Sequence, residues 1–150
     1  MTAGVDTETT QRLRIVFGHL ARVLRTTEAG LAADLTPTRV VVLLNTVRNG
    51  PIRIAEVAEQ EGLNPTLLSR TVANLAQDGL VTRTADELAR RSAWLDATPA
   101  GRELAGEIRA QRTQAVEAAL ARLSNEDRKL VEEALPALEQ LAQHLHRDGS

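Results

Sequence analysis

The residues best suited to contact another molecule lie on one side of a predicted helix that runs from Asn64 to Asp78. At helical spacing this side is small and polar, holds one basic residue, and has no acid before Asp78. Its members are Pro65, Thr66, Ser69, Arg70 and Ala73. Hydroxyl and guanidinium groups can hydrogen-bond to base edges and phosphates, and small neighbours let a helix enter a major groove. The pattern therefore indicates recognition of double-stranded DNA.

The chain around this helix predicts a helix-turn-helix followed by a β-hairpin wing. A short helix carries Ile54, Val57 and Ala58 on one face and ends before Gly62, which suits a left-handed C-terminal position. Asn64-Pro65 then supplies the N-cap and the first residue of the second helix. The apolar side of that helix consists of Leu68, Val72, Leu75 and Ala76. Short strands at 80–84 and 92–96 flank a charged loop, and Ile52-Arg53-Ile54 could add a third strand.

Several arginines are candidates for contact with DNA. Arg70 either contacts a base or phosphate or only solvates a helix face, and we favour contact because it is the sole basic residue there. Arg90 and Arg91 either enter a minor groove or are ordinary loop charges, and we again favour contact. Trp94 is either packed under the wing or exposed for a partner, and packing is the better interpretation. The predicted DNA-binding set is Asn64, Pro65, Thr66, Ser69, Arg70, Arg83, Arg90 and Arg91.

Further helices are expected on both sides of this module. Residues 11–27 and 98–147 carry apolar residues at helical spacing, whereas residues 28–34 are expected to form a loose connection. Thr36-Pro37 begins a helix that is apolar on more than one side, which predicts a central, buried position. Its apolar residues are Val40, Val41, Leu43, Leu44 and Val47. A capping box at residues 124–127 starts a last helix, which Pro136 should kink or shift.

The apolar stripes of the terminal helices are too long to be covered by the winged module alone. Long amphipathic helices of this kind usually bury against a second copy, most often in a C2 dimer. We therefore expect a homodimer. The expected interface residues are Leu13, Leu20, Val131, Leu138, Leu141 and Leu145.

Length and composition limit the remaining possibilities. The 150 residues are 43% hydrophobic and 25% charged, which suits one domain with a sizeable core. No apolar run approaches the roughly 20 residues that span a bilayer, and no export signal is visible, so a cytoplasmic protein is expected. The absence of cysteine excludes disulfides, thiol redox switches and cysteine-rich zinc sites. The net charge of −2 argues against strong non-specific binding to DNA.

No pattern in the sequence indicates an enzyme, a metal site or a cofactor. His144 and His146 are two residues apart, so a helix would point them in different directions. Ser69 has no nearby histidine and acid that suggest catalysis, and no glycine-rich phosphate loop occurs. His19 is expected at the surface or in an interface, with a ligand pocket as the lesser alternative.

Taken together, these segments resemble the MarR family of winged helix-turn-helix transcriptional regulators. The resemblance rests on LTPTRVVVLLNTV, IAEVAEQEGLNPTLLSRTVANLAQDGLV and RR…LDATPAG, in that order, and covers nearly the whole chain. It implies a mainly α fold with a small β-hairpin wing, one domain over 1–150, a winged unit at 36–97, and dimerisation helices at 11–27 and 98–147. It also implies a repressor that binds a palindromic operator as a homodimer and is released by a small aromatic or anionic ligand.

One position departs from the family pattern. The family's wing commonly has an acidic residue two positions before the arginine that matches Arg91, and this chain has Ala89 there. The ion pair that would brace the wing is missing unless Asp86 or Glu87 replaces it.

We expect a ligand pocket where the terminal helices meet the winged unit, near Phe17, Leu20, Leu24, Leu44 and Ile108. The alternative function is a winged-helix module that docks protein without specific DNA binding.

Overall fold

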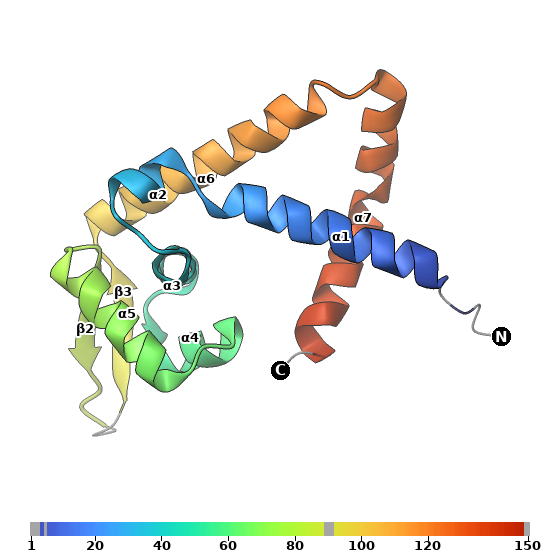
Figure 1. Cartoon of the computed structure of the whole chain (residues 1–150). Coiled ribbons are helices and arrows are strands. Elements are labelled where there is room, and N and C mark those ends of the chain that lie inside the picture. The colour runs from blue at the N-terminus through green and yellow to red at the C-terminus, as the bar shows by residue number, and fades with distance from the viewer. Residues whose placement is uncertain (1–3, 5, 89–91, 149–150) are drawn as a thin grey trace.

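The computed structural model describes residues 4, 6–88 and 92–148 and is mainly helical, with one small antiparallel sheet (Figure 1). This arrangement confirms the predicted fold class. In chain order the elements are α1 (Thr7–Arg25), α2 (Glu28–Ala32), α3 (Pro37–Asn49), β1 (Ile52–Arg53), α4 (Ile54–Glu61), α5 (Pro65–Gln77), β2 (Val81–Ala85), β3 (Ala93–Ala97), α6 (Pro99–Leu120) and α7 (Asn125–Asp148).

The hydrophobic core lies in the winged unit, around α3. Val42 and Leu43 on this helix are completely buried, as predicted for a central element. The helices α4, α5 and the first half of α6 pack around α3 and contribute further fully buried side chains. These side chains are Val57, Leu68, Leu75, Ala105 and Ile108. The first half of α6 is therefore part of the winged unit, although the helix continues well beyond it (Figure 1).

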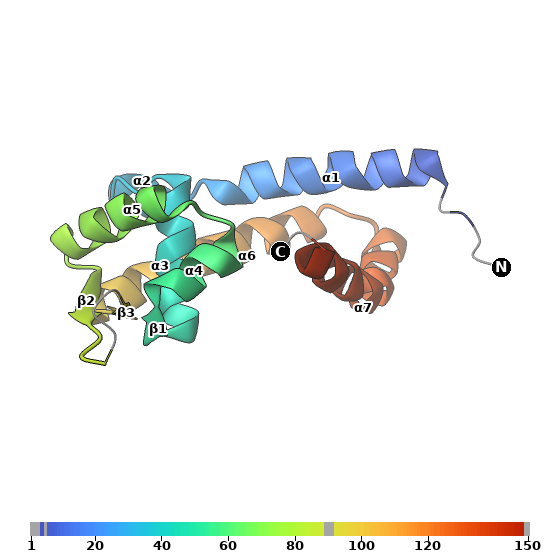
Figure 2. The ribbon, with the colours of Figure 1, turned by 90° about the horizontal axis from the view of Figure 1, so that it is seen from below.

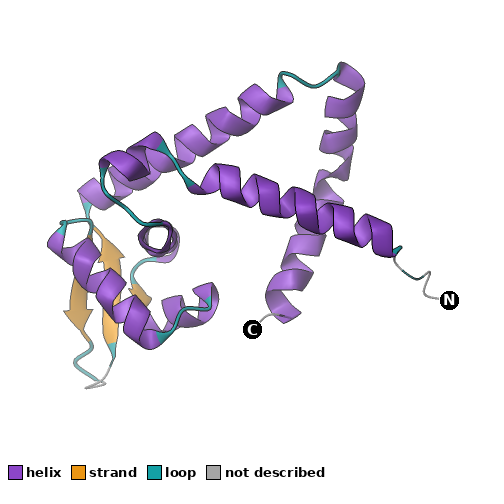
Figure 3. Ribbon diagram, in the orientation of Figure 1, coloured by secondary structure: helices purple, strands orange, loops and turns teal. Residues whose placement is uncertain are grey.

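The three strands form a sheet in the order β1-β3-β2, at one end of the winged unit (Figure 3). Both pairings are antiparallel, with Ile52 opposite Leu95 and Val81 opposite Ala97. Ala93, Leu95 and Ala97 in β3 are buried and alternate with partly exposed residues, as the period of two predicts. The predicted wing strands are confirmed, each displaced by one residue, and the third strand is the two-residue β1.

Local capping fixes where the helices begin. The side chains of Thr36, Asn64 and Thr98 each accept a hydrogen bond from a backbone N–H in the first turn of the following helix, and each of these helices has proline near its start. Gly62 ends α4 with a φ of 60°, in the left-handed region that the sequence predicts for it. The turn between α4 and α5 is thus determined by residues within it.

The helices α1 and α7 and the second half of α6 extend away from the winged unit (Figure 2). The α1 helix buries none of its residues, although it carries Ile15, Val16, Leu20 and Val23, each at least half exposed. On α7, Leu130, Leu135 and Leu145 are likewise more than half exposed. Among the described residues, no helix combines the length and apolar character required to cross a membrane.

One prediction about a helix was wrong. Residues 28–34 contain the short helix α2 instead of a loose connection. The Thr27 hydroxyl accepts a hydrogen bond from Gly30 N–H at 3.2 Å, and the Gln111 side chain accepts one from Ala29 N–H at 2.9 Å. Pro136, which was predicted to kink the last helix or shift its start, lies inside α7, and that helix begins at Asn125. The fixed φ of Pro136 is compatible with a helix, and α7 is largely exposed, so water can satisfy the carbonyl that loses its partner.

In two helices, one residue on the buried face also differs from the prediction. In α3, Val42 is buried and Val41 is 37% exposed. The sequence could not predict this, because three consecutive valines do not determine which of them faces the core. In α5, Thr71 is buried in place of Ala76. Thr71 can be buried because its hydroxyl donates a hydrogen bond to the Leu67 carbonyl at 2.9 Å.

Candidate nucleic-acid interface

The helix α5 exposes the side that the sequence predicts for contact with DNA. All five members of that side are exposed, whereas Leu68, Thr71, Val72 and Leu75 hold the opposite side in the core. The exposed members are Pro65, Thr66, Ser69, Arg70 and Ala73. Arg70 forms no ion pair with any other described residue, so its guanidinium is available to an acceptor outside the chain.

Asn64 has a structural role at the start of this helix. Its side-chain oxygen accepts hydrogen bonds from Thr66 N–H at 2.9 Å and from Leu67 N–H at 3.1 Å. Only the amide NH2 of Asn64 remains free to donate to a phosphate or a base. The cap also fixes the direction in which the first turn of α5 faces.

The helix α5 and the wing share a hollow of about 540 Å³. Pro65 and Ser69 line it from α5, and Arg83 lines it from β2. The remaining lining residues are Ile54, Ala55, Ala58, Leu68, Ser92 and Ala93. The fold therefore brings Pro65, Ser69 and Arg83 together on one concave surface. Thr66 and Arg70 on α5, and Asn64 just before it, lie outside the lining of this hollow.

The wing is braced by an ion pair that differs from the family pattern. The Asp86 carboxylate lies 3.5 Å from the Arg53 guanidinium, and the Asp86 side chain is only 8% exposed. The same guanidinium lies 5.1 Å from the centroid of the Trp94 ring, and Trp94 is half-buried on β3. This confirms the packed interpretation of Trp94. Arg90 and Arg91, together with Ala89, lie outside the described residues.

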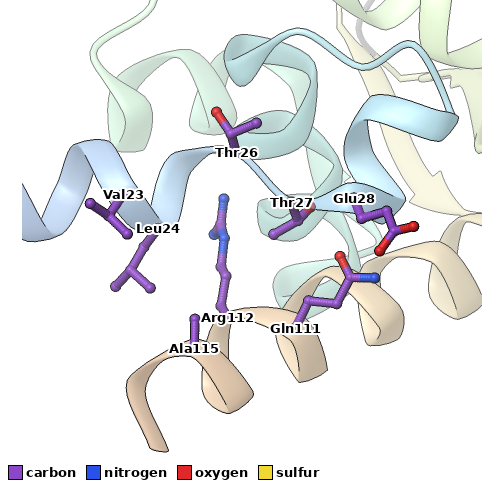
Figure 4. Close-up of a pocket in the computed structure, with 8 residues that line it drawn as sticks. All are labelled: Val23, Leu24, Thr26, Thr27, Glu28, Gln111, Arg112 and Ala115. Atoms are coloured by element: carbon purple, nitrogen blue, oxygen red, sulfur yellow. The ribbon is translucent and has the colours of Figure 1, made fainter. Parts of the chain in front are cut away.

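A smaller cavity of about 220 Å³ lies where α1 and α2 meet α6 (Figure 4). Its walls are Val23, Leu24, Thr26, Thr27, Glu28, Gln111, Arg112 and Ala115. The Arg112 side chain rises from α6 between Leu24 and Thr27, and its Nε is buried with no hydrogen-bond partner among the described residues. Burial lowers the pKa of the Arg112 guanidinium. An unpaired buried donor of this kind favours an acceptor that enters from outside.

The residues predicted to form a ligand pocket do not line one cavity. Ile108 is completely buried in the core and Leu44 packs against it, while Phe17 is half-buried on α1. Leu24 lines both the cavity beside Arg112 and an adjoining groove of about 510 Å³ between α1, α6 and α7, and Leu20 lines only the groove. That groove is almost wholly apolar, with His19 at its edge. Of the five residues, Leu20 and Leu24 line a cavity or groove at this junction, whereas Ile108 and Leu44 belong to the core.

The six residues predicted for a dimer interface lie on α1 and α7. Leu20, Val131 and Leu145 are exposed, and Leu13, Leu138 and Leu141 are half-buried. Leu20 on α1 and Val131 on α7 both line the apolar groove.

Three residues outside the predicted set stand out. Arg53 precedes α4 and contacts the wing, Leu67 on α5 is 44% exposed beside the reading side, and Arg112 lines the cavity of Figure 4. Arg112 carried a detectable signal, because it lies four residues after Ile108 on the stripe of α6 that is otherwise apolar. Arg53 carried none, since its partner is 33 residues away in the sequence.

No group of three or more potential metal ligands occurs among the described residues. His144 is exposed on α7, and the side chain of His146 lies outside the described part of the chain.

Comparisons with known proteins agree with this architecture. A sequence profile of the MarR family matches residues 33–92, which span α3, the helix-turn-helix and the first strand of the wing. A curated relative from Bacillus subtilis, YwhA, described as an uncharacterized HTH-type transcriptional regulator, is 25% identical over 102 residues, 68% of this chain and 73% of its own.

Solved structures share the fold over most of the chain. A MarR family protein from Bacillus stearothermophilus has a TM-score of 0.77 at 22% identity, covering 95% of this chain and 99% of that protein. Streptococcus pneumoniae FabT, solved in complex with DNA, has a TM-score of 0.68 at 18% identity, covering 92% and 97%. Residues 33–92 thus match the MarR family of winged helix-turn-helix transcriptional regulators, and the chain as a whole shares the fold of solved MarR family proteins.

Proposed function

We propose that this protein is a sequence-specific DNA-binding repressor that acts as a homodimer on a near-palindromic operator. The observation that carries the proposal is the exposed, acid-free side of α5, which faces outward next to the hollow that Arg83 lines. A protein of the same fold, FabT, has been solved in complex with DNA, which supports the same use of this surface here. In this arrangement α5 enters the major groove, and Thr66, Ser69 and Arg70 meet base edges or flanking phosphates.

The terminal helices support the dimer. The apolar side chains of α1 and α7 are largely exposed in the single chain, and the groove between them is almost wholly apolar. A second copy would cover these faces and set the separation of the two copies of α5, which we call the reading helices. Two copies of α5 about 34–36 Å apart would meet successive major grooves on one side of the duplex.

The test is a titration of the purified protein against a palindromic fragment from its own upstream region, at two or more salt concentrations. We expect a two-fold symmetric footprint, tighter binding than to unrelated DNA, and affinity that falls as salt rises. Reduced transcription from that promoter in the presence of the protein would support repression. Binding to a protein partner without any DNA shift would instead favour the interaction module.

A small ligand would relieve this repression by occupying the cavity beside Arg112. Val23, Leu24 and Ala115 give the cavity an apolar part, and the unpaired guanidinium donor of Arg112 suits a small aromatic or anionic molecule. The cavity contacts both the end of α1 and the middle of α6, so its occupant could favour one separation of the reading helices over another. A difference of about 1.4 kcal/mol between the two arrangements would change operator affinity tenfold.

A further inference from the structure

The base of the wing contains a cluster of three side chains from three different strands or their ends. Arg53 belongs to β1, Asp86 directly follows β2, and Trp94 belongs to β3. The Arg53 guanidinium lies 3.5 Å from the Asp86 carboxylate and 5.1 Å from the centroid of the Trp94 ring. We call these three residues the wing-base cluster.

Asp86 connects the two arms of the wing. One of its carboxylate oxygens faces Arg53, and the other accepts a hydrogen bond from Leu88 N–H at 3.0 Å. Its own backbone N–H donates to the Ser92 carbonyl at 3.0 Å, just before β3 begins. A change at Asp86 therefore affects both sides of the hairpin where it leaves the sheet.

Arg53 connects the wing to the helix-turn-helix. Its backbone pairs with Trp94 in the sheet, and it is also the residue that precedes α4. The Arg53 N–H donates to the Glu56 side chain at 3.2 Å, in the first turn of α4. The side chain of Arg53 thus reaches the wing from a backbone position that is fixed to the first helix of the helix-turn-helix.

The geometry also relates the cluster to the proposed DNA surface. Arg83 lies three residues before Asp86 on β2 and lines the hollow that also contains Pro65 and Ser69 of α5. A tilt of the wing would move Arg83 relative to α5. The orientation of the wing therefore decides whether both elements can meet the same duplex.

We propose that Arg53 is a positioning residue for DNA recognition, which holds the wing at a fixed angle to α5 through Asp86 and Trp94. This inference rests on the proposed DNA binding and adds a residue that the reading surface itself does not contain. It differs from a direct role, in which the half-exposed Arg53 would only donate to a phosphate. The two roles make opposite predictions for Asp86.

The deciding variant is Asp86→Asn. Removal of a negative charge near the DNA surface would strengthen binding if simple electrostatics prevailed. If the carboxylate positions the wing, binding to the operator fragment falls, by roughly tenfold for a coupled pair of this kind. Arg53→Met should give a similar loss, Arg53→Lys should recover part of it, and the double variant Arg53→Met/Asp86→Asn should be no weaker than either single variant.

The chain offers a spectroscopic readout that is independent of DNA. Trp94 is the only tryptophan, so its fluorescence reports on the cluster alone. Arg53→Met should increase quenching of Trp94 by acrylamide. The matched control is Arg102→Met, which removes a similarly exposed arginine from a 3.0 Å ion pair with Asp96 and should change neither quenching nor operator affinity appreciably.

Each outcome has a definite meaning. If Asp86→Asn binds the operator as tightly as the parent protein or more tightly, the positioning role is wrong, even though DNA binding stands. A loss confined to the Arg53 variants, with a flatter salt dependence, would identify a phosphate contact instead. If the parent protein binds no operator fragment, the proposed function itself fails, and the positioning role falls with it. Circular dichroism would show whether each variant is folded. If Arg53→Met does not fold, the Arg53→Lys and Asp86→Asn variants still test the proposal.

Discussion

Gly101, in the first turn of α6, lies against the carbonyl group of Leu80 so closely that a side chain at this position would overlap the Leu80 oxygen. That oxygen also accepts a hydrogen bond from Thr98 N–H at 3.1 Å, and the Thr98 hydroxyl donates to the Gly79 carbonyl at 2.6 Å. The start of α6 is therefore fixed to the turn between α5 and β2. This junction joins the reading helix, the wing and the long helix that leaves the winged unit.

Gly101→Ala should destabilise the protein by about 1–3 kcal/mol, because the added carbon cannot fit without moving backbone. Gly106 is the matched control, since it lies in the same helix and an added carbon there meets no atom within 4 Å. Gly106→Ala should leave stability unchanged or raise it by up to about 1 kcal/mol. Urea unfolding measures both, and equal effects at the two glycines would contradict the close approach.

Arg70→Ala should weaken binding to the operator by about 1–3 kcal/mol if its guanidinium meets a base. Loss of a phosphate contact alone would weaken binding to all sequences equally and reduce the salt slope by about one. Arg109→Ala is the control, because Arg109 is also exposed but lies on α6, away from the reading helix. Titrations of operator and unrelated DNA distinguish these cases, and an unchanged affinity for both would exclude Arg70 from the interface.

Leu138→Glu should convert the dimer into monomers and abolish operator binding at the same time. A charged side chain in an apolar interface loses its hydration without gaining a partner. Gln140→Glu adds the same charge to the same helix at an exposed polar position and should leave the dimer intact. Sedimentation at micromolar concentration measures the oligomeric state, and a dimeric Leu138→Glu variant would place the interface elsewhere.

Arg112→Met should separate ligand response from folding. Replacement of the guanidinium removes a buried donor that lacks a partner, so stability should stay the same or increase. Benzoate, used as a small aromatic anion, should raise the melting temperature of the parent protein and lower its operator affinity, and Arg112→Met should lose both effects. Arg109→Met on the same helix should retain them. A benzoate response that survives in Arg112→Met would mean that the anion binds at another site.

The sequence predicted the parts of this molecule that depend on neighbours within a few residues. The caps at Thr36 and Asn64 and the left-handed Gly62 follow from residue types at fixed offsets, and so does the exposed side of α5. The helix α2 was missed because Gln111, 82 residues further along the chain, accepts a hydrogen bond from its backbone. The Arg53–Asp86 pair was missed for the same reason, since only the sheet brings the two side chains together.

The family resemblance helped with the order of elements and less with particular side chains. It drew attention to the missing acid at Ala89 but could not say which acid takes over the bracing of the wing. The structure assigns a brace to Asp86, whose partner lies in β1 and outside the hairpin. The rotation of each helix about its axis decides whether residues such as Phe17, Leu44 and Ile108 face a cavity. Apolar residues on several faces of a helix leave that rotation undetermined in the sequence.

The division of α6 between two environments has a mechanical consequence. Its first half is held in the core by Gly101, Ala105 and Ile108, and its second half borders the apolar groove with α1 and α7. A straight helix of 22 residues is about 33 Å long, so a small rotation at the groove end becomes a larger displacement at the end that adjoins α5 and the wing. A rotation of roughly 6° at one end would displace the other by about 3.4 Å, the rise of one base pair. A rotation too small to alter the packing of either half would therefore change the separation of the two copies of α5 in the proposed dimer. The two helices would then no longer match the spacing of the major grooves in the operator.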